Sequence, residues 1–232
     1  MAKHIGIVAC SVEGAALCYR TIGGEGANRM GRHAHPEVSM HTHPLSEYMQ
    51  YIETSDWAAV ARLMLDSTEK LARIGAEFAI CPDNTIHQAF ELVQPRSPIP
   101  WLHIAEVAAE EAKRNQFHTV GILGTKYLME GPVYPPQLNA RGIECVIPDE
   151  EERIRINQII FDELVYGRIL ESSRRYFYQV IQRLKKNGCD AVALSCTEIP
   201  LIVGPDASSL PTLDSTRLLA RAAVRFAVGE TE

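Results

Sequence analysis

Two stretches of the sequence decide the fold: residues 188–200 read GCDAVALSCTEIP, and residues 75–87 read GAEFAICPDNTIH. Each begins with a glycine that suits the end of a helix, passes through an acidic residue into an apolar run, and ends in small polar residues. Counted from its glycine, each has a reactive residue at the same offset, Cys196 at 196 − 188 = 8 and Asp83 at 83 − 75 = 8. The sequence therefore predicts two comparable strand ends, one with a thiol and one with a carboxylate.

Further strand-like runs precede these stretches, at residues 3–10 (KHIGIVAC) and 118–125 (HTVGILGT). Strands that alternate with helices predict parallel sheets with helices on both faces. We therefore expect an α/β fold of two similar lobes, each a parallel sheet flanked by helices, with 1–98 and 208–232 in the first lobe and 99–207 in the second. Because ligands of such sheets bind at the carboxyl ends of the strands, the active site is expected in the cleft between the lobes.

Local patterns predict the remaining elements. The glycine-rich run 21–31 (TIGGEGANRMG) indicates a loop, and apolar residues at helical spacing indicate one long helical region over 46–73. The proline-rich turn 94–100 is the best candidate for a hinge. A capping loop, with Asp214 or Ser215 as the N-cap, is expected to open the last helix.

The composition excludes several classes of protein. The chain has 232 residues, 46% hydrophobic and 22% charged, with a net charge of −6 and no clustered basic face of the kind that nucleic-acid binding needs. No apolar run reaches the roughly 18 residues of a membrane helix, and no signal-peptide pattern opens the chain, so we expect a cytoplasmic protein without a membrane partner. The six cysteines lack C-x-x-C spacing, which argues for free thiols in a reducing compartment.

Four histidines gather in one short run: His33, His35, His41 and His43. Residues two apart on a strand point to the same side, and imidazoles are common zinc ligands. However, no carboxylate or thiol stands at a recognisable ligand spacing from them. We therefore expect no metal site, and interpret the group as polar loop histidines near a substrate.

The motifs CPDNT, NT-x-H, GILGT and SCTEI, with the HPLSEY helix start and the late LD-S/T helix cap, resemble the aspartate/glutamate racemase superfamily, most closely its aspartate racemase branch. The resemblance covers nearly the whole chain. It implies catalysis without a cofactor, by one acid/base residue from each lobe, usually a cysteine, on either side of the α-carbon of a small amino acid or related carboxylic acid. It also implies a homodimer.

The resemblance assigns the catalytic pair residue by residue. Cys196 matches the second-lobe cysteine of the superfamily, and the alternative is a buried structural cysteine. Asp83 stands where the first-lobe cysteine is usual, and Cys81 lies two residues earlier, on the same face of an extended strand but about 6–7 Å farther back. An aspartate is normally ionised, and desolvation would restore its acid role. The alternative is that Asp83 only caps the following turn.

The resemblance also implies substrate contacts: Ser11, Asn84, Thr85, Thr125 and Thr197 match positions that hold the α-carboxylate, Glu198 matches an acidic residue that positions its neighbours, and Arg168 resembles a family lysine or arginine that contacts substrate. Each hydroxyl or amide could equally serve a turn or cap, and Arg168 could be a surface charge. No arginine aligns near residue 36, where acidic-substrate racemases have one, so Glu37 and the histidines leave room for neutral or cationic substrates.

Three functions follow from the mismatch between the strand ends. If Asp83 transfers protons, the protein is an amino-acid racemase with a Cys/Asp pair, because inversion needs an acid and a base on opposite faces. If it does not, Cys196 alone protonates one face, as in single-cysteine decarboxylase-like lyases. The third is a catalytically inactive relative that binds a small ligand.

Overall fold

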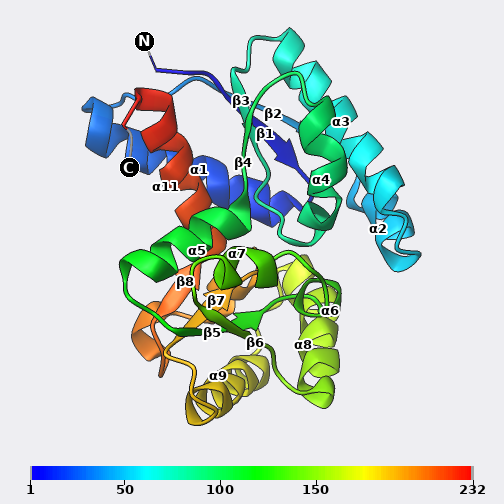
Figure 1. Ribbon diagram of the computed structural model, residues 1–232, viewed down its shortest axis with the longest axis vertical. Helices are drawn as coiled ribbons and strands as arrows, with labels where there is room; N and C mark the ends of the chain where they lie inside the picture. Colours follow the sequence, from blue (N-terminus) through cyan, green and yellow to red (C-terminus); the bar gives the residue numbers. More distant parts are fainter. Residues whose placement is uncertain (1, 231–232) are drawn as a thin grey trace. The chain divides into compact units, whose positions relative to one another are not determined.

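The computed structural model describes residues 2–230, so residues 1, 231 and 232 of the expected first lobe lie outside it. The chain divides into two compact units, Met1–Ile104 with Thr216–Glu232, and Ala105–Ser215. Figure 1 follows this order in colour, with the C-terminal helix α11 in red. The units end slightly later than the divisions expected at 98/99 and 207/208.

The first unit contains a four-stranded parallel sheet in the order β2-β1-β3-β4. Its elements are β1 (Ile5–Ala9), α1 (Val12–Met30), β2 (Val38–Thr42), α2 (Leu45–Glu53), α3 (Trp57–Arg73), β3 (Phe78–Ile80), η1 (Thr85–Ala89), α4 (Phe90–Val93), η2 (Gln94–Arg96), β4 (Trp101–Leu102) and α11 (Ser215–Val228). The central strand β1 is buried throughout, as its β-branched run predicts. Helix α11 joins this unit through a hydrogen bond from Lys3 N to Ala227 O of 2.8 Å.

The second unit contains a sheet of the same kind, in the order β6-β5-β7-β8. Its elements are α5 (Ile104–Arg114), β5 (Thr119–Leu123), α6 (Lys126–Met129), α7 (Pro135–Asn139), β6 (Glu144–Val146), α8 (Glu150–Asp162), η3 (Leu164–Tyr166), α9 (Glu171–Lys186), β7 (Ala191–Leu194), α10 (Ile199–Ile202), η4 (Pro205–Ala207) and β8 (Thr212–Asp214). Two parallel sheets flanked by helices confirm the predicted fold class.

The two quoted stretches end their preceding helices in the same way. Gly75 and Gly188 have φ angles of 99° and 94°, which suit glycine. In the first unit Ala76 N donates to Leu71 O, and in the second Cys189 N donates to Leu184 O, both at 3.0 Å. These are the longer bonds of a Schellman motif, so the glycine in each stretch stops the helix and turns the chain into the strand.

The match extends to the packing of helix on sheet. A Cβ added to Gly6 of β1 would lie 3.4 Å from Leu71 Cβ, and one added to Gly121 of β5 would lie 2.8 Å from Leu184 Cδ1. These leucines also accept the helix-ending bonds, at 75 − 71 = 4 and 188 − 184 = 4 residues before their glycines. The missing side chain of each strand glycine therefore lets the corresponding helix pack closely against its sheet. The two units share this packing arrangement.

Two local predictions are wrong. Residues 21–31, expected as a loop, continue helix α1 as far as Met30. Leu17, Cys18 and Ile22 are buried along this helix, so packing outweighs the low helix propensity of its glycines. Gly26 has a packing role, because an added Cβ would lie 2.7 Å from His35 Cα.

The expected helix over 46–73 is two helices, α2 and α3. The break falls at Ser55, which has a φ of 56°, and Asp56 then caps α3 by accepting from Ala59 N at 2.9 Å. The expected capping loop before the last helix contains the short strand β8, paired with β7 from Val192 to Leu194. Among the described residues no helix is both long and apolar enough to cross a membrane.

Candidate active site

The end of β7 brings a thiol, a hydroxyl and a carboxylate together. Cys196 Sγ donates to Glu198 Oε2 at 3.0 Å, and Thr197 Oγ1 donates to the same oxygen at 2.7 Å. The three residues are only 9%, 3% and 3% exposed, in chain order. Because a carboxylate accepts the thiol hydrogen, this arrangement fixes the direction of the S–H bond of Cys196.

Thr125 lies at the same edge of the second sheet. Leu123 of β5 pairs with Leu194 of β7, and Thr125 and Cys196 each follow two residues later. Thr125 is buried and caps α6, since its Oγ1 accepts from Leu128 N at 3.2 Å. The capping role that the sequence analysis gave as an alternative for Thr125 is therefore observed. The Thr125 hydroxyl lies at the same sheet edge as the Cys196 thiol.

Asp83 follows β3 in the first unit and is half-buried. Its Oδ1 accepts a hydrogen bond from Ile86 N at 3.2 Å, so the side chain caps the turn into η1. A carboxylate has about four lone-pair sites, so a single capped amide does not fill the group. The capping alternative is thus observed, and it does not exclude an acid/base role.

Cys81, the other thiol near this strand end, is fully buried, and its Sγ donates to Asp83 O at 3.8 Å. Burial raises the pKa of Cys81 well above its ordinary value, and the nearby Asp83 carboxylate raises it further. The thiol therefore stays protonated at neutral pH, so Asp83 is the better proton acceptor of the two.

His87 braces the backbone of the same loop. Its Nδ1 lies 2.6 Å from Asp83 O, and its Nε2 lies 3.5 Å from Ile104 N, at the start of α5. Burial lowers the pKa of His87 well below its ordinary value, and His103, at a ring distance of 4.7 Å, lowers it further. The neutral ring that donates from Nδ1 and accepts at Nε2 satisfies both contacts, and it holds the loop that carries Asp83.

The other expected contacts of the first unit lie beside Asp83. Ser11 follows β1, the neighbour of β3, and caps α1 by accepting from Gly14 N at 3.2 Å. Asn84 and Thr85 are buried. Apart from Arg168, the expected residues of each unit thus follow the carboxyl ends of adjacent strands.

Arg168 is exposed, between η3 and α9. Its guanidinium carbon lies 5.8 Å from the centre of the Tyr166 ring, and its backbone N donates to Glu163 O at 2.9 Å. These contacts are local to its own segment, so the surface-charge interpretation describes them well.

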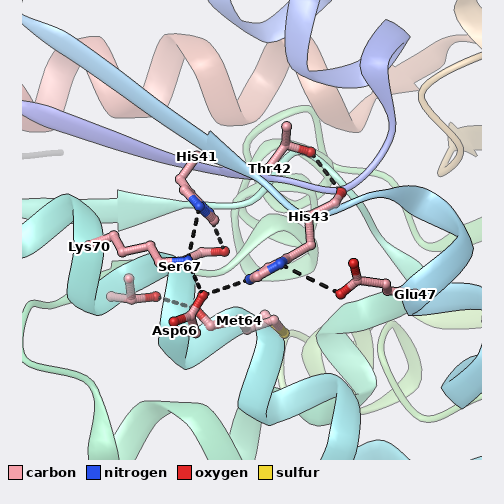
Figure 2. Close-up of polar contacts among 9 residues, drawn as sticks. His41, Thr42, His43, Glu47, Met64, Asp66, Ser67 and Lys70 are labelled. Atoms are coloured by element: carbon pink, nitrogen blue, oxygen red, sulfur yellow. Dashed lines mark hydrogen bonds and ion pairs between the residues drawn. The ribbon is translucent and has the colours of Figure 1, made fainter.

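A second polar cluster lies beside β2 (Figure 2). His41 Nδ1 lies 2.9 Å from Ser67 Oγ, and His43 Nε2 lies 2.8 Å from Asp66 Oδ2. Lys70 Nζ donates to the same Asp66 oxygen at 2.5 Å and lies 3.3 Å from His41 Nε2. The spacing of His41 and His43 places them on one side of a strand, but no local pattern identified Asp66, which lies on α3, the second helix after β2.

The charges of the cluster follow from its contacts. Burial lowers the pKa of His41, and the positive Lys70 lowers it further, so this ring is neutral at pH 7. The hydrogen bond from Lys70 lowers the pKa of Asp66, which is therefore ionised. His33 and His35 precede β2 and are not part of this cluster.

The fold and these strand ends define an α/β enzyme with polar groups at the carboxyl ends of two similar parallel sheets. Residues 7–223 match the family described as Asp/Glu/Hydantoin racemase, so the chain belongs to that family. It is therefore an isomerase of the amino-acid racemase type, and the predicted superfamily is confirmed.

Individual relatives agree with this assignment. The chain is 31% identical to a Yersinia pestis protein of known crystal structure, with a TM-score of 0.89 and coverage of 97% of this chain and 99% of that one. It is 27% identical to an aspartate racemase homologue from Pyrococcus horikoshii OT3, with a TM-score of 0.84 and coverage of 98% and 100%. The broad specificity amino-acid racemase RacX of Bacillus subtilis (strain 168) is 24% identical over 73% of each chain.

Proposed function

We propose that the chain is a cofactor-independent amino-acid racemase in which Cys196 and Asp83 are the two acid/base residues. The observation that carries the proposal is the hydrogen bond from the Cys196 thiol to Glu198, because it prepares a proton donor at the end of β7. Asp83, at the matching offset in the first unit, supplies the carboxylate that accepts a proton. The proposal requires the two groups to reach opposite faces of one α-carbon.

Inversion in one direction moves two protons. The Asp83 carboxylate takes the α-proton from one face, and the Cys196 thiol gives its hydrogen to the other face. This leaves a protonated Asp83 and a Cys196 thiolate, which return to the starting state when the opposite enantiomer reacts. Glu198 and Thr197 keep the sulfur in place, and Ser11, Asn84, Thr85 and Thr125 supply hydroxyls and amides for the substrate carboxylate.

We further propose that the substrate is a small amino acid or related carboxylic acid whose side chain need not be acidic. The support is the sequence HPEVS near residue 36, which has no arginine to pair with a second carboxylate. The description of RacX as a broad specificity amino-acid racemase is consistent with this proposal. Arg168 is the proposed cationic contact from the second unit, and its exposure leaves its side chain able to move.

Exchange in heavy water tests the reaction and its substrate together. The full-length protein is incubated with each of a panel of L- and D-amino acids, and chiral chromatography with mass spectrometry follows α-deuterium. Racemisation predicts deuterium in both enantiomers. Release of carbon dioxide from a malonate-type acid would instead favour the decarboxylase-like lyase. Binding of a ligand without exchange would exclude both the racemase and the lyase activity.

Two substitutions test the catalytic pair. Cys196→Ser is expected to abolish inversion, whereas Cys145→Ser, at a half-buried thiol of β6 whose pKa burial raises to about 11, should leave it intact. Asp83→Asn keeps an oxygen to cap Ile86 N but cannot accept the α-proton, so it should fold with unchanged stability and lose inversion. Full inversion by either Cys196→Ser or Asp83→Asn would remove that residue from the mechanism.

We also propose a cytoplasmic homodimer. The described cysteines are all free thiols, which suits a reducing compartment. Two-fold dimers are the commonest oligomers of soluble enzymes. Light scattering coupled to size-exclusion chromatography tests the dimer, and a monomer at micromolar concentration would refute it.

A further inference from the structure

Three metal-binding side chains converge where β2 ends (Figure 2). His41 is in β2, His43 follows it directly, and Asp66 lies on α3; one ligand atom from each lies within 4.8 Å of the others. Imidazole nitrogen and carboxylate oxygen are the donors of many zinc sites. We propose that His41, His43 and Asp66 bind a divalent transition metal ion of the Zn²⁺ type, which ties β2 to α3.

The two imidazoles are already held in orientations that suit coordination. His41 Nδ1 is 2.9 Å from Ser67 Oγ, and His43 Nδ1 is 3.7 Å from the Glu47 carboxylate. In both rings Nε2 is therefore the atom turned towards the other members of the cluster. Histidines that bind metals are almost always fixed in this way through their second nitrogen, which sets the tautomer and the direction of the ring.

Lys70 shows that the cluster attracts a cation. Its ammonium contacts Asp66 Oδ2 at 2.5 Å and His41 Nε2 at 3.3 Å, so it lies among the proposed ligand atoms. The lysine side chain is 41% exposed and long enough to turn into the solvent. Metal binding is therefore an exchange of cations, in which the ion takes the place of the ammonium.

The exchange needs only small movements. Ligands about 2 Å from a tetrahedral zinc ion lie about 3.3 Å apart, so no separation between the ligand atoms, all within 4.8 Å of one another, needs to shorten by more than about 1.5 Å. His43 Nε2 now contacts Asp66 and must lose its hydrogen to bind a metal. The other ring nitrogen, Nδ1, faces the Glu47 carboxylate at 3.7 Å and can carry the hydrogen instead. The fourth coordination position is left for water.

The site has a mechanical consequence for the first unit. Within residues 2–230, β2 is the edge strand of its sheet and pairs with β1 alone, from Ile5↔Val38 to Ala9↔Thr42. A metal bridge to α3 would fasten the end of this strand. Since Ser11 follows β1, the bridge would also steady the backbone next to a proposed substrate contact. This inference rests on residues other than the proposed catalytic pair, so either can fail alone.

Cobalt titration tests the site in the full-length chain. The reduced protein is first stripped with a chelator, and Co²⁺ is then added while visible ligand-field bands are recorded; calorimetry with Zn²⁺ gives the affinity. We expect saturable binding of one ion per chain, without the near-ultraviolet bands of a cobalt thiolate. We also expect a rise in the melting temperature with Zn²⁺ concentration, because an ion that binds only the folded state stabilises it.

Four variants make the test specific. His41→Ala and Asp66→Asn should abolish binding, and Ser67→Ala should weaken it about tenfold through the loss of the bond that orients His41. Lys70→Met should tighten it about tenfold, because the competing positive charge is gone. A general structural defect would lower the metal affinity in every variant, so it would not explain a higher affinity in Lys70→Met.

The matched control is His118→Ala, at a histidine whose side chain is 83% exposed and which lies in the other unit, and it should bind like the natural chain. Binding that survives Asp66→Asn and His41→Ala would overturn the assignment. So would the absence of saturable binding below about a millimolar. Binding by Lys70→Met alone would show that the ammonium is the permanent cation of the cluster, which also overturns the proposal.

Discussion

Replacing Glu198 is the most direct test of how the end of β7 is built. Its carboxylate accepts from Cys196 Sγ and Thr197 Oγ1, and the side chain is 3% exposed. Glu198→Ala removes this acceptor from two buried donors. At about 1–3 kcal/mol for each donor deprived of its acceptor, the free energy of unfolding should fall by about 2–6 kcal/mol. That is a large share of the roughly 5–15 kcal/mol that stabilises a typical domain.

Glu198→Gln separates the hydrogen bonds from the charge. The amide oxygen still accepts from both donors, but bonds to a neutral acceptor are weaker than bonds to a carboxylate. We expect a loss of about 1–2 kcal/mol, well below that of the alanine variant. Because the thiol keeps its orientation, proton exchange in heavy water should also persist better in Glu198→Gln than in Glu198→Ala.

Urea unfolding followed by circular dichroism measures these differences, with Glu53→Ala as the control. Glu53 is an exposed acid at the end of α2, and its replacement should change the free energy of unfolding by less than about 0.5 kcal/mol. A loss below about 1 kcal/mol in Glu198→Ala would refute the reasoning, since the two contacts would then contribute little. Equal losses in the alanine and glutamine variants would refute it as well, because the acceptor would then not matter.

Two further predictions concern the helix that the sequence did not reveal and a buried histidine. Gly26→Ala should destabilise the protein by about 1–3 kcal/mol, because the new Cβ would lie 2.6 Å from His35 Cβ. Gly24→Ala, whose new Cβ would meet no atom within 4 Å, should stabilise α1 by about 0.5–1 kcal/mol. Chemical unfolding of both variants measures these opposite changes in the free energy of unfolding. Burial lowers the pKa of His103 to about 4, from about 6.5 in the unfolded chain, so the unfolded state binds more protons between these values. The contribution of neutral His103 to the free energy of unfolding, about 3 kcal/mol, is therefore fully present above pH 6.5 and is lost as the pH falls to 4. The free energy of unfolding of His103→Gln, measured across this pH range, should lack this part of the acid dependence.

The sequence predicts the architecture because its signals are local and occur twice. Gly75 and Gly188 each end a helix through their own backbone, and the leucine four residues earlier packs against the glycine of the neighbouring strand. Such features depend on residues close together in the chain. The shared turn explains why Cys196 and Asp83 both lie shortly after a strand, two residues after the end of β7 and three after the end of β3.

The parts that were missed depend on distant residues. Helix α1 runs through four glycines, and Gly26 is required by the close approach of the backbone at His35 rather than by a turn. Asp66 joins His41 and His43 because α3 packs beside β2, a contact that no spacing along the chain encodes. Propensity and spacing rules therefore failed where tertiary packing sets the choice of residue.

The exchange of thiol for carboxylate between the two strand ends has a simple structural basis. Both ends carry the pattern cysteine, any residue, acid: Cys81 and Asp83 in the first unit, Cys196 and Glu198 in the second. Counted from the helix-ending glycines, the first pair lies at 81 − 75 = 6 and 83 − 75 = 8, and the second at 196 − 188 = 8 and 198 − 188 = 10. The same two chemical groups are thus shifted by two residues relative to the helix-ending glycine.

The shift decides which group stands at the eighth position and which one supports it. In the second unit the thiol of Cys196 stands there, and it donates to the carboxylate of Glu198, two residues later in the chain. In the first unit the carboxylate stands there, and the thiol before it is buried, protonated and bonded to the backbone of Asp83. In the mechanism that we propose, the thiol at one position is the proton donor and the carboxylate at the other is the acceptor, which are the opposite protonation states that inversion of an α-carbon requires.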